Sequence, residues 1–266
     1  MKLSVLMSLY NKESSENLNL AMDSLSKQTL LPNEVVLVHD GQLTIELYNE
    51  IDKWRSILNI VDVRLSTNQG LATALNHGIE KCTGELIARF DTDDICHPTR
   101  FEKQINFMFH NPDIQVVGTS CREFGASYAL DEKHLPKTHE ELVLFSVTRC
   151  PFIHPSVMFR REVFDNGKRY PTNIPFTEDM GLWCDLIVSG YKFANINEVL
   201  LDYRLNENTI ERRKGFGKAL SEIKIRLKFM RKVKQITVKN LTLVFARLAF
   251  HLLPSNFVKL AYKKAR

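Results

Sequence analysis

The sequence predicts an α/β fold: a Rossmann-like, mostly parallel sheet flanked by helices, followed by a basic helical extension. In the first half of the chain, apolar β-branched runs alternate with amphipathic stretches, which is typical of right-handed βαβ units. A chain of 266 residues with 44% hydrophobic content can bury one large core. From residue 211 onward the chain carries sixteen Lys and Arg residues but only two acidic residues. These features predict a catalytic domain over residues 1–210 and an extension over 211–266.

Strands are predicted where apolar, β-branched residues run together, and helices where apolar residues recur at helical spacing. In the first half, the patterns predict strands over 3–9, 34–38, 61–65, 85–90 and around 116–117, and helices through 18–25, 43–58, 71–79 and 101–108. After Phe124 the alternation weakens, but helices over 138–147 and 177–189 and strands over 157–159 and 199–203 are still predicted. In parallel sheets, ligands bind beyond the carboxyl ends of the strands, where Tyr10, Asp40, Asn68 and Asp91 fall.

The strand over 85–90 runs directly into three carboxylates, Asp91, Asp93 and Asp94. Carboxylates packed this densely repel one another and resist burial, so a cation between them would resolve the conflict. On an extended segment Asp91 and Asp93 point to the same side. Oxygen ligands suit Mg²⁺ or Mn²⁺, and magnesium-like ions leave positions open for substrate phosphates. The alternative is a solvated acidic turn that caps the helix beginning near Pro98.

Three further residues of the first half each have more than one interpretation. Asp40, at the end of the second strand, can accept hydrogen bonds from a base or a ribose, or can belong to an ordinary Asp-Gly turn. Asn68 begins a helix, with Gly70 permitting close backbone approach to a ligand, or is a simple N-cap. Arg89 can offset the carboxylate repulsion, meet a phosphate, or be a plain surface arginine.

The second half offers a second carboxylate site. Glu178 and Asp179 follow Thr177 at a helix start, where acids commonly complement the helix dipole, but where one of them can also serve as a general base. His154 is a candidate catalyst or a hydrogen-bonded structural residue. Trp183 lies on the same helical face as Asp179, so it can stack on a sugar ring or pack in the core.

Composition excludes several classes of protein. Five scattered cysteines without a Cys-x-x-Cys pair indicate a reducing compartment and argue against a zinc site and a disulfide framework: Cys82, Cys96, Cys121, Cys150 and Cys184. Residues 1–10 resemble the beginning of a signal peptide, but a polar stretch follows at once, which favours a buried first strand. Residues 1–210 carry twenty basic and twenty-nine acidic residues, which argues against nucleic-acid binding by this part.

The extension is predicted to form amphipathic helices. Apolar residues recur at helical spacing, with Lys and Arg between them: Phe216, Leu220, Ile223, Leu227 and Met230. A second apolar segment, over 241–253, is interrupted by Arg247 and is too short to span a bilayer. Basic residues beside an apolar helical face fit anionic lipid, which predicts peripheral attachment to a membrane. The alternative is that these helices pack on the catalytic body, or on a second subunit in a homodimer, and leave the lysines solvated.

Taken together and in this order, the motifs resemble those of a known family. They are Val5-Leu-Met-Ser-Leu-Tyr-Asn-Lys-Glu13, Asp40, Asn68-Gln-Gly-Leu, Gly84-Glu-Leu-Ile-Ala-Arg-Phe-Asp-Thr-Asp-Asp94, His154-Pro-Ser and Thr177-Glu-Asp-Met-Gly-Leu-Trp183. The chain resembles the family 2 inverting glycosyltransferases of the GT-A fold over about residues 3–205. It looks most like the bacterial enzymes that assemble O-antigen and exopolysaccharide repeat units.

The resemblance implies a role for each motif. The nucleotide part of a UDP-sugar would be bound by Tyr10, Glu13, Asp40, Asn68, Arg89, Asp91 and Thr92. Asp91 and Asp93 would hold Mn²⁺ or Mg²⁺ against its diphosphate, and Asp94 would line the donor sugar. Asp179 would be the base that deprotonates the acceptor hydroxyl, with His154, Glu178 and Trp183 on the acceptor side. Many relatives carry a histidine where this chain has Asn206, so no histidine role is carried over there.

The resemblance also implies a reaction: β1,3 transfer of a hexose from UDP-galactose to an N-acetylhexosamine on undecaprenyl diphosphate, at the cytoplasmic face of the bacterial inner membrane. Two other classes compete with it. A sugar nucleotidyltransferase would favour a Gly-rich phosphate loop after the first strand, which residues 10–13 lack. A basic lipid-binding or nucleic-acid-binding module would fit the extension alone, and would leave the two carboxylate sites unexplained.

Overall fold

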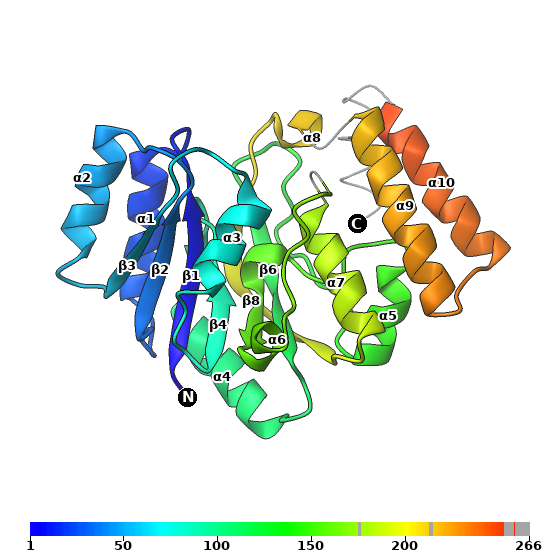
Figure 1. Ribbon diagram of the computed structural model, residues 1–266, viewed down its shortest axis with the longest axis horizontal. Helices are drawn as coiled ribbons and strands as arrows, with labels where there is room; N and C mark the ends of the chain where they lie inside the picture. The colour runs from blue at the N-terminus through cyan, green and yellow to red at the C-terminus, as the bar shows by residue number, and fades with distance from the viewer. Residues whose placement is uncertain (175–176, 213–214, 253–257, 259–266) are drawn as a thin grey trace.

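The computed structural model describes residues 1–174, 177–212, 215–252 and 258 and contains one eight-stranded sheet between two layers of helices (Figure 1). The strand order is β3-β2-β1-β4-β7-β6-β8-β5. The strands are β1 (Leu3–Leu9), β2 (Glu34–His39), β3 (Ile60–Arg64), β4 (Leu86–Arg89), β5 (Ile95–Cys96), β6 (Val116–Phe124), β7 (Met158–Arg160) and β8 (Phe193–Arg204).

Parallel pairing dominates the sheet, as predicted. β1 pairs in parallel with β2 and β4, β2 with β3, and β6 with β8. The short strand β7 is antiparallel to both of its neighbours, β4 and β6, and β5 is antiparallel to β8. Because β1, β2 and β4 are mutually parallel, their carboxyl ends meet at one edge of the sheet. The residues predicted to bind ligands follow these strand ends, so they lie at this edge.

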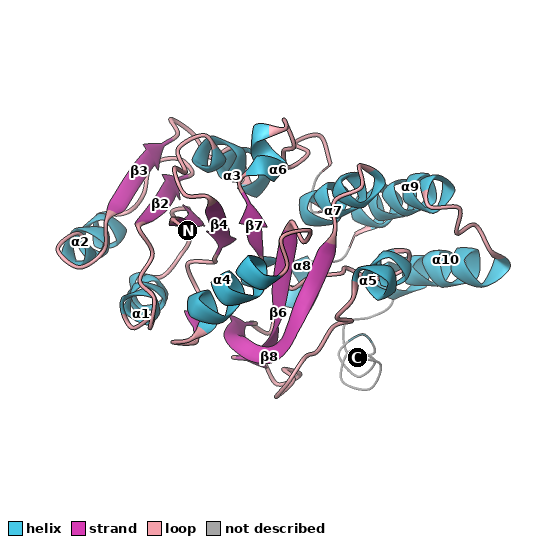
Figure 2. Cartoon of the chain, turned by 90° about the horizontal axis from the view of Figure 1, so that it is seen from below, coloured by secondary structure: helices cyan, strands magenta, loops and turns pink. Residues whose placement is uncertain are grey.

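The helices cover both faces of the sheet (Figure 2). They are α1 (Ser15–Ser26), α2 (Ile45–Trp54), α3 (Leu71–Ile79), α4 (Arg100–His110), α5 (His139–Ser146), α6 (Glu162–Asp165), α7 (Glu178–Val188), α8 (Thr209–Arg212), α9 (Phe216–Lys232) and α10 (Val238–Leu252). Alternate β1 residues, beginning with Leu3 and Val5, pack against α1, α2 and α4, whereas Leu6 faces the core of α3 and α7. This alternation follows from the two-residue period of a strand.

Most predicted elements are confirmed, and the exceptions have physical causes. The helix over 71–79 and the strand over 3–9 have the predicted bounds. β8 was predicted only over 199–203 but extends from Phe193, because polar and exposed residues around Asn197 interrupt its apolar pattern. The strand β5 and the helices α6 and α8 were not predicted. They have two, four and four residues, which is too short to show a hydrophobic periodicity.

The basic extension shares its core with the catalytic domain. α9 packs along α7, and its Ile223, Phe229 and Met230 belong to the same buried cluster as Trp183 of α7. Arg226 is 2% exposed, forms an ion pair with Glu222, and donates hydrogen bonds from Nη1 to the carbonyl oxygens at the end of α5. These contacts satisfy carbonyl groups that a helix end leaves without partners. The inner side of α9 therefore packs on the body, the alternative that the sequence left open.

Replacing Arg226 by Met is expected to destabilise the protein by about 3 kcal/mol, because Glu222 would keep a buried charge without its partner. The free energy of unfolding in urea measures this effect. Lys228→Met is the matched control, since this lysine lies exposed on the same helix. Equal stability of the two variants would contradict the integration of α9 into the fold.

Candidate functional site

A cavity of about 950 Å³ opens at the carboxyl edge of the sheet. Nine of the residues singled out in the sequence line it: Tyr10, Glu13, Asp40, Asn68, Arg89, Asp91, Thr92, Asp93 and Glu178. They come from the ends of β1, β2 and β4, from the beginning of α3 and from the beginning of α7. Residues separated by up to 168 positions in the sequence thus form one site.

Asp40, which lines this cavity, joins the end of β2 to the beginning of α3 by hydrogen bonds. Its Oδ1 accepts a hydrogen bond from the Gln69 backbone N–H at 2.7 Å, and its Oδ2 accepts one from the Gly70 N–H at 3.0 Å. Gly41 has a φ of +89°, and a Cβ at that position would lie 2.8 Å from the Asn68 nitrogen, so only glycine fits. The Asp-Gly turn and the start of α3 are therefore one unit. Asp40 therefore belongs to the turn and also lines the cavity.

The loop after β1 forms the adjacent wall. The Glu13 N–H donates to the Tyr10 carbonyl at 3.1 Å, which closes a turn. Glu13 Oε1 accepts hydrogen bonds from the Ser14 N–H at 2.8 Å and from Asn17 Nδ2 at 3.0 Å. These bonds fix the carboxylate at the beginning of α1, where the helix dipole favours a negative charge.

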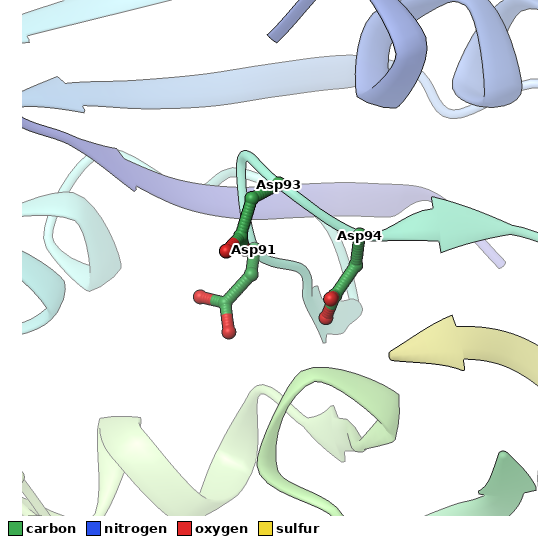
Figure 3. A group of neighbouring side chains, drawn as sticks. All are labelled: Asp91, Asp93 and Asp94. Carbon is green, nitrogen blue, oxygen red and sulfur yellow. The ribbon is translucent and has the colours of Figure 1, made fainter. Parts of the chain in front are cut away.

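Asp91 and Asp93 of the acidic cluster line the cavity, and Figure 3 shows their side chains with that of Asp94. One ligand oxygen each from Asp91, Asp93 and Asp94 can be chosen so that all lie within 4.8 Å of one another. In Figure 3 the Asp93 carboxylate points toward that of Asp91. Burial raises the pKa of Asp93 to about 7, and the negative charges of Asp91 and Glu13 add to the effect. Such a set of oxygens fits a hard divalent cation, which would relieve the repulsion.

Arg89 lies beneath the cluster as a buried cation. It is 2% exposed, and its Nη2 forms an ion pair with Asp91 Oδ1. Its Nε and Nη1 have no hydrogen-bond partner within the described residues. The surface alternative for Arg89 is therefore wrong. Arg89 also lines the cavity, although these two nitrogens are themselves buried, so it contributes positive charge to the site.

The structure contradicts a direct contact between Asp94 and a donor sugar. The Asp94 side chain is 0% exposed, and its Oδ1 accepts a hydrogen bond from the Arg204 backbone N–H at 2.8 Å. Arg204 Nε donates to the Asp93 carbonyl oxygen at 2.7 Å. Burial, together with Asp91 and Asp93, raises the pKa of Asp94 well above its usual range. Asp94 thus joins the acidic turn to the end of β8 instead of facing the cavity.

The two carboxylates at the beginning of α7 differ in their surroundings. Glu178 lines the cavity, and burial, followed by the charge of Asp179, raises its pKa. Asp179 is half-buried; its Oδ1 accepts a hydrogen bond from the Met180 N–H at 2.7 Å, and its Oδ2 accepts one from the Cys150 thiol at 3.6 Å. Glu178 therefore forms part of the cavity wall, whereas Asp179 does not line the cavity and lies beside Cys150.

Two residues expected on the acceptor side serve the core. Trp183 is 0% exposed, and its ring stacks at 5.6 Å on Phe159 and meets Phe152 edge-on at 5.0 Å. The prediction that it stacks on a sugar is wrong, because aromatic neighbours occupy its faces. His154 Nε2 is hydrogen-bonded to the Tyr170 hydroxyl at 2.9 Å, and burial lowers its pKa well below the usual range. Its structural interpretation fits this environment, and it does not line the cavity.

Three cations of the cavity wall were given no site role from the sequence: Lys12, Arg204 and Lys218. Arg204 ends β8, and its guanidinium lies 4.5 Å from the centre of the Phe124 ring. Its position directly after the last predicted strand, at the carboxyl edge of the sheet, could have indicated that it belongs to the site. Lys218 lies on the first turn of α9, within a segment predicted to be a separate extension. No local motif distinguishes it from the other lysines there.

The chain matches the Glycosyl transferase family 2 over residues 4–167. It is 37% identical over 265 residues to the amylovoran biosynthesis glycosyltransferase AmsE of Erwinia amylovora, covering 99% of this chain and 98% of that one. It is 36% identical over 271 residues to the UDP-Gal:alpha-D-GlcNAc-diphosphoundecaprenol beta-1,3-galactosyltransferase of Escherichia coli, covering 99% and 96%.

Solved structures share the fold at low sequence identity. S. aureus TarS 1–349 in complex with UDP-GlcNAc has a TM-score of 0.68 and 17% identity, with 94% of this chain and 72% of that chain covered. This chain spans 45% of the longer S. aureus TarS chain, with a TM-score of 0.63. The mannosyltransferase PcManGT from Pyrobaculum calidifontis, in complex with GDP-Man and Mn²⁺, has a TM-score of 0.61 and 15% identity, covering 99% and 85%. The fold is therefore of the GT-A type.

Proposed function

Since this chain belongs to glycosyltransferase family 2 and is a nucleotide-sugar glycosyltransferase of bacterial polysaccharide assembly, we propose that it transfers a hexose from a UDP-sugar to a sugar-diphospho-undecaprenyl acceptor with inversion. UDP-galactose is the proposed donor, and a β1,3 linkage to an N-acetylhexosamine is the proposed product. The E. coli relative whose name states this donor and linkage is 36% identical over nearly the whole chain, which supports the choice.

One observation carries the proposal: a single cavity is lined by Asp91 and Asp93 of the acidic cluster, by Asp40 and Asn68, and by a second carboxylate at Glu178. An inverting transfer needs a donor site and an acceptor site that share one cavity, because donor and acceptor must meet in line. The arrangement also disfavours a lipid-binding or nucleic-acid-binding module, which would have no use for two carboxylate sites in one cavity.

On the donor side, Tyr10, Glu13, Asp40, Asn68 and Thr92 would surround the nucleoside and Arg89 would meet the diphosphate. Asp91 and Asp93 would hold Mn²⁺ or Mg²⁺, whose oxygen-ligand preference their carboxylates satisfy. When bound, the cation would supply positive charge to the donor diphosphate and to the departing UDP. Arg89, which is paired with Asp91 in the cavity wall, would supply further positive charge.

On the acceptor side, Asp179 is the proposed base and Glu178 orients the acceptor sugar. Asp179 takes the proton from the acceptor hydroxyl as that oxygen bonds to the anomeric carbon and the bond from that carbon to the UDP oxygen breaks. The attack comes from the face opposite the leaving group, so the configuration inverts. Hydrogen bonds from the Met180 N–H and the Cys150 thiol hold the Asp179 carboxylate in one orientation.

We also propose peripheral attachment to the cytoplasmic face of the bacterial inner membrane. In the part of the chain that the structure describes, no helix is both long and apolar enough to cross a bilayer. Exposed apolar side chains of α10, among them Val238, Leu243 and Phe245, lie near exposed lysines of α9 and α10. This combination fits an anionic lipid surface, where a lipid-linked acceptor would reside.

Acidification from about pH 8 to about pH 6 is expected to weaken Mn²⁺ binding, because the ion must displace a proton from Asp93, whose pKa is raised to about 7. The affinity should be nearly constant above that pKa and should fall by up to about tenfold per pH unit below it. Calorimetric titration across this range measures the effect. Asp93→Asn should remove the pH dependence and Asp91→Ala should abolish binding, whereas a pH-independent affinity in the unaltered protein would refute the site.

Replacing Asp179 by Asn is expected to lower kcat by roughly 10²- to 10⁴-fold while UDP binding stays unchanged, because only the proton acceptor is lost. Glu178→Gln is the matched control and should mainly raise the acceptor KM. Steady-state kinetics and a UDP titration separate the two effects. If Glu178→Gln abolishes turnover and Asp179→Asn does not, the role of base passes to Glu178.

Reversing the charge at Lys224, Lys228 and Lys232 is expected to weaken binding to vesicles of anionic phospholipid by at least about tenfold. All three are exposed on α9, so the fold should persist. The same reversal at exposed lysines of the catalytic domain, Lys27, Lys53 and Lys81, serves as the control. Equal sedimentation of both triple variants with the vesicles would exclude the α9 surface as the attachment site.

A further inference from the structure

The helix α9, which begins the basic extension, supplies a cation to the cavity. Lys218 lies on its first turn, is half-buried, and lines the same cavity as Glu178. The positive charge of Lys218 acts on Glu178 and partly offsets the rise in its pKa, which indicates that the two side chains are close. An element outside the alternating βα pattern therefore contributes to the acceptor end of the site.

The position of Lys218 is held rigidly. Ala219, the next residue, is buried, and one turn further Ile223 enters the main core. Arg226 then ties the helix to the end of α5. In Figures 1 and 2, α9 lies side by side with α7, and Figure 1 shows the two helices running in the same direction. Their first turns, carrying Lys218 and Glu178, thus face the cavity together.

Three other cations line the cavity: Lys12, Arg89 and Arg204. Arg89 forms an ion pair with Asp91, and Arg204 donates to the Asp93 carbonyl oxygen, so both serve the acidic cluster. Lys218 comes instead from α9, and its charge acts on Glu178. The first-turn N–H groups of α9 and its dipole add to the positive potential there, which favours an anionic group of a ligand.

The proposed acceptor carries such a group. Its sugar is joined to the lipid through a diphosphate, which lies one sugar ring away from the hydroxyl that is deprotonated. If the hydroxyl lies at the carboxylates of α7, the diphosphate would therefore lie near a cation next to them. Beyond Lys218, the exposed Lys224, Lys228 and Arg231 continue along α9, so positive charge extends from the cavity toward the surface proposed to meet lipid.

We propose that Lys218 and the first turn of α9 bind the diphosphate of the lipid-linked acceptor, and so select acceptors that carry a diphosphate over neutral glycosides. This inference rests on the proposed function, because it presupposes a sugar-diphospho-lipid acceptor. It assigns to the extension a part of the active site in addition to its contact with the membrane.

The test compares two synthetic acceptors with the same N-acetylhexosamine, one joined to an alkyl chain through a diphosphate and one through a single glycosidic oxygen. Lys218→Met is expected to raise the KM for the diphosphate acceptor by roughly ten- to hundredfold, the effect of one lost charge-assisted contact. The KM for the neutral glycoside and the affinity for UDP should stay unchanged. Lys218→Arg should retain most of the preference, and Lys224→Met, on the same helix, should retain all of it.

Each other outcome has a distinct meaning. An equal rise in KM for both acceptors would overturn the inference, because Lys218 would then act only through its effect on Glu178. A loss of UDP affinity would overturn it too, since the diphosphate bound by Lys218 would be the donor's. If the unaltered protein transfers no sugar to the diphosphate acceptor, the proposed function fails; if it does and Lys218→Met keeps the full preference, only this inference fails.

Discussion

The repulsion among Asp91, Asp93 and Asp94 is the constraint on which the site depends. Burial, together with the negative charge of the neighbouring carboxylates, raises the pKa of Asp93 to about 7 and that of Asp94 well above its usual range. The protein compensates only in part: Arg89 pairs with Asp91, and the backbone N–H of Arg204 bonds to Asp94. A divalent cation would complete the compensation. The cluster is thus electrostatically strained in a way that favours a metal and a diphosphate.

The mixed sheet places partners around this cluster. The parallel strands β1, β2 and β4 bring Tyr10, Asp40 and Asp91 to one edge, as a doubly wound sheet requires. The antiparallel strand β7 lies between β4 and β6, so that β6 and β8 form a second parallel pair on the far side of β4. Because β8 ends at Arg204, its terminus meets the acidic turn. Both halves of the sheet therefore contribute residues to the cavity.

Sequence patterns predicted the parallel half of the sheet and the cavity residues at its carboxyl edge well, because strand ends and acidic motifs are local signals. Tyr10, Asp40, Asn68 and Asp91 were found as strand-end residues, and all line the cavity. The patterns failed where tertiary burial decides the role of a side chain. A tryptophan on a helix has the same local signature in a core or beneath a sugar, and for Trp183 the rings of Phe152 and Phe159 make the difference.

The same limit explains why the C-terminal helices were read as a separate module. Composition distinguishes basic from acidic segments but does not show which side of a helix is buried, and the buried side of α9 is held by Arg226, itself a basic residue. A positive charge that would ordinarily count toward the solvated surface instead caps α5 within the core. Any force that moves α9 at a lipid surface would therefore act on α7, whose first turn carries Glu178 and Asp179. Membrane contact and acceptor binding would then be coupled through one pair of packed helices, with no hinge needed between them.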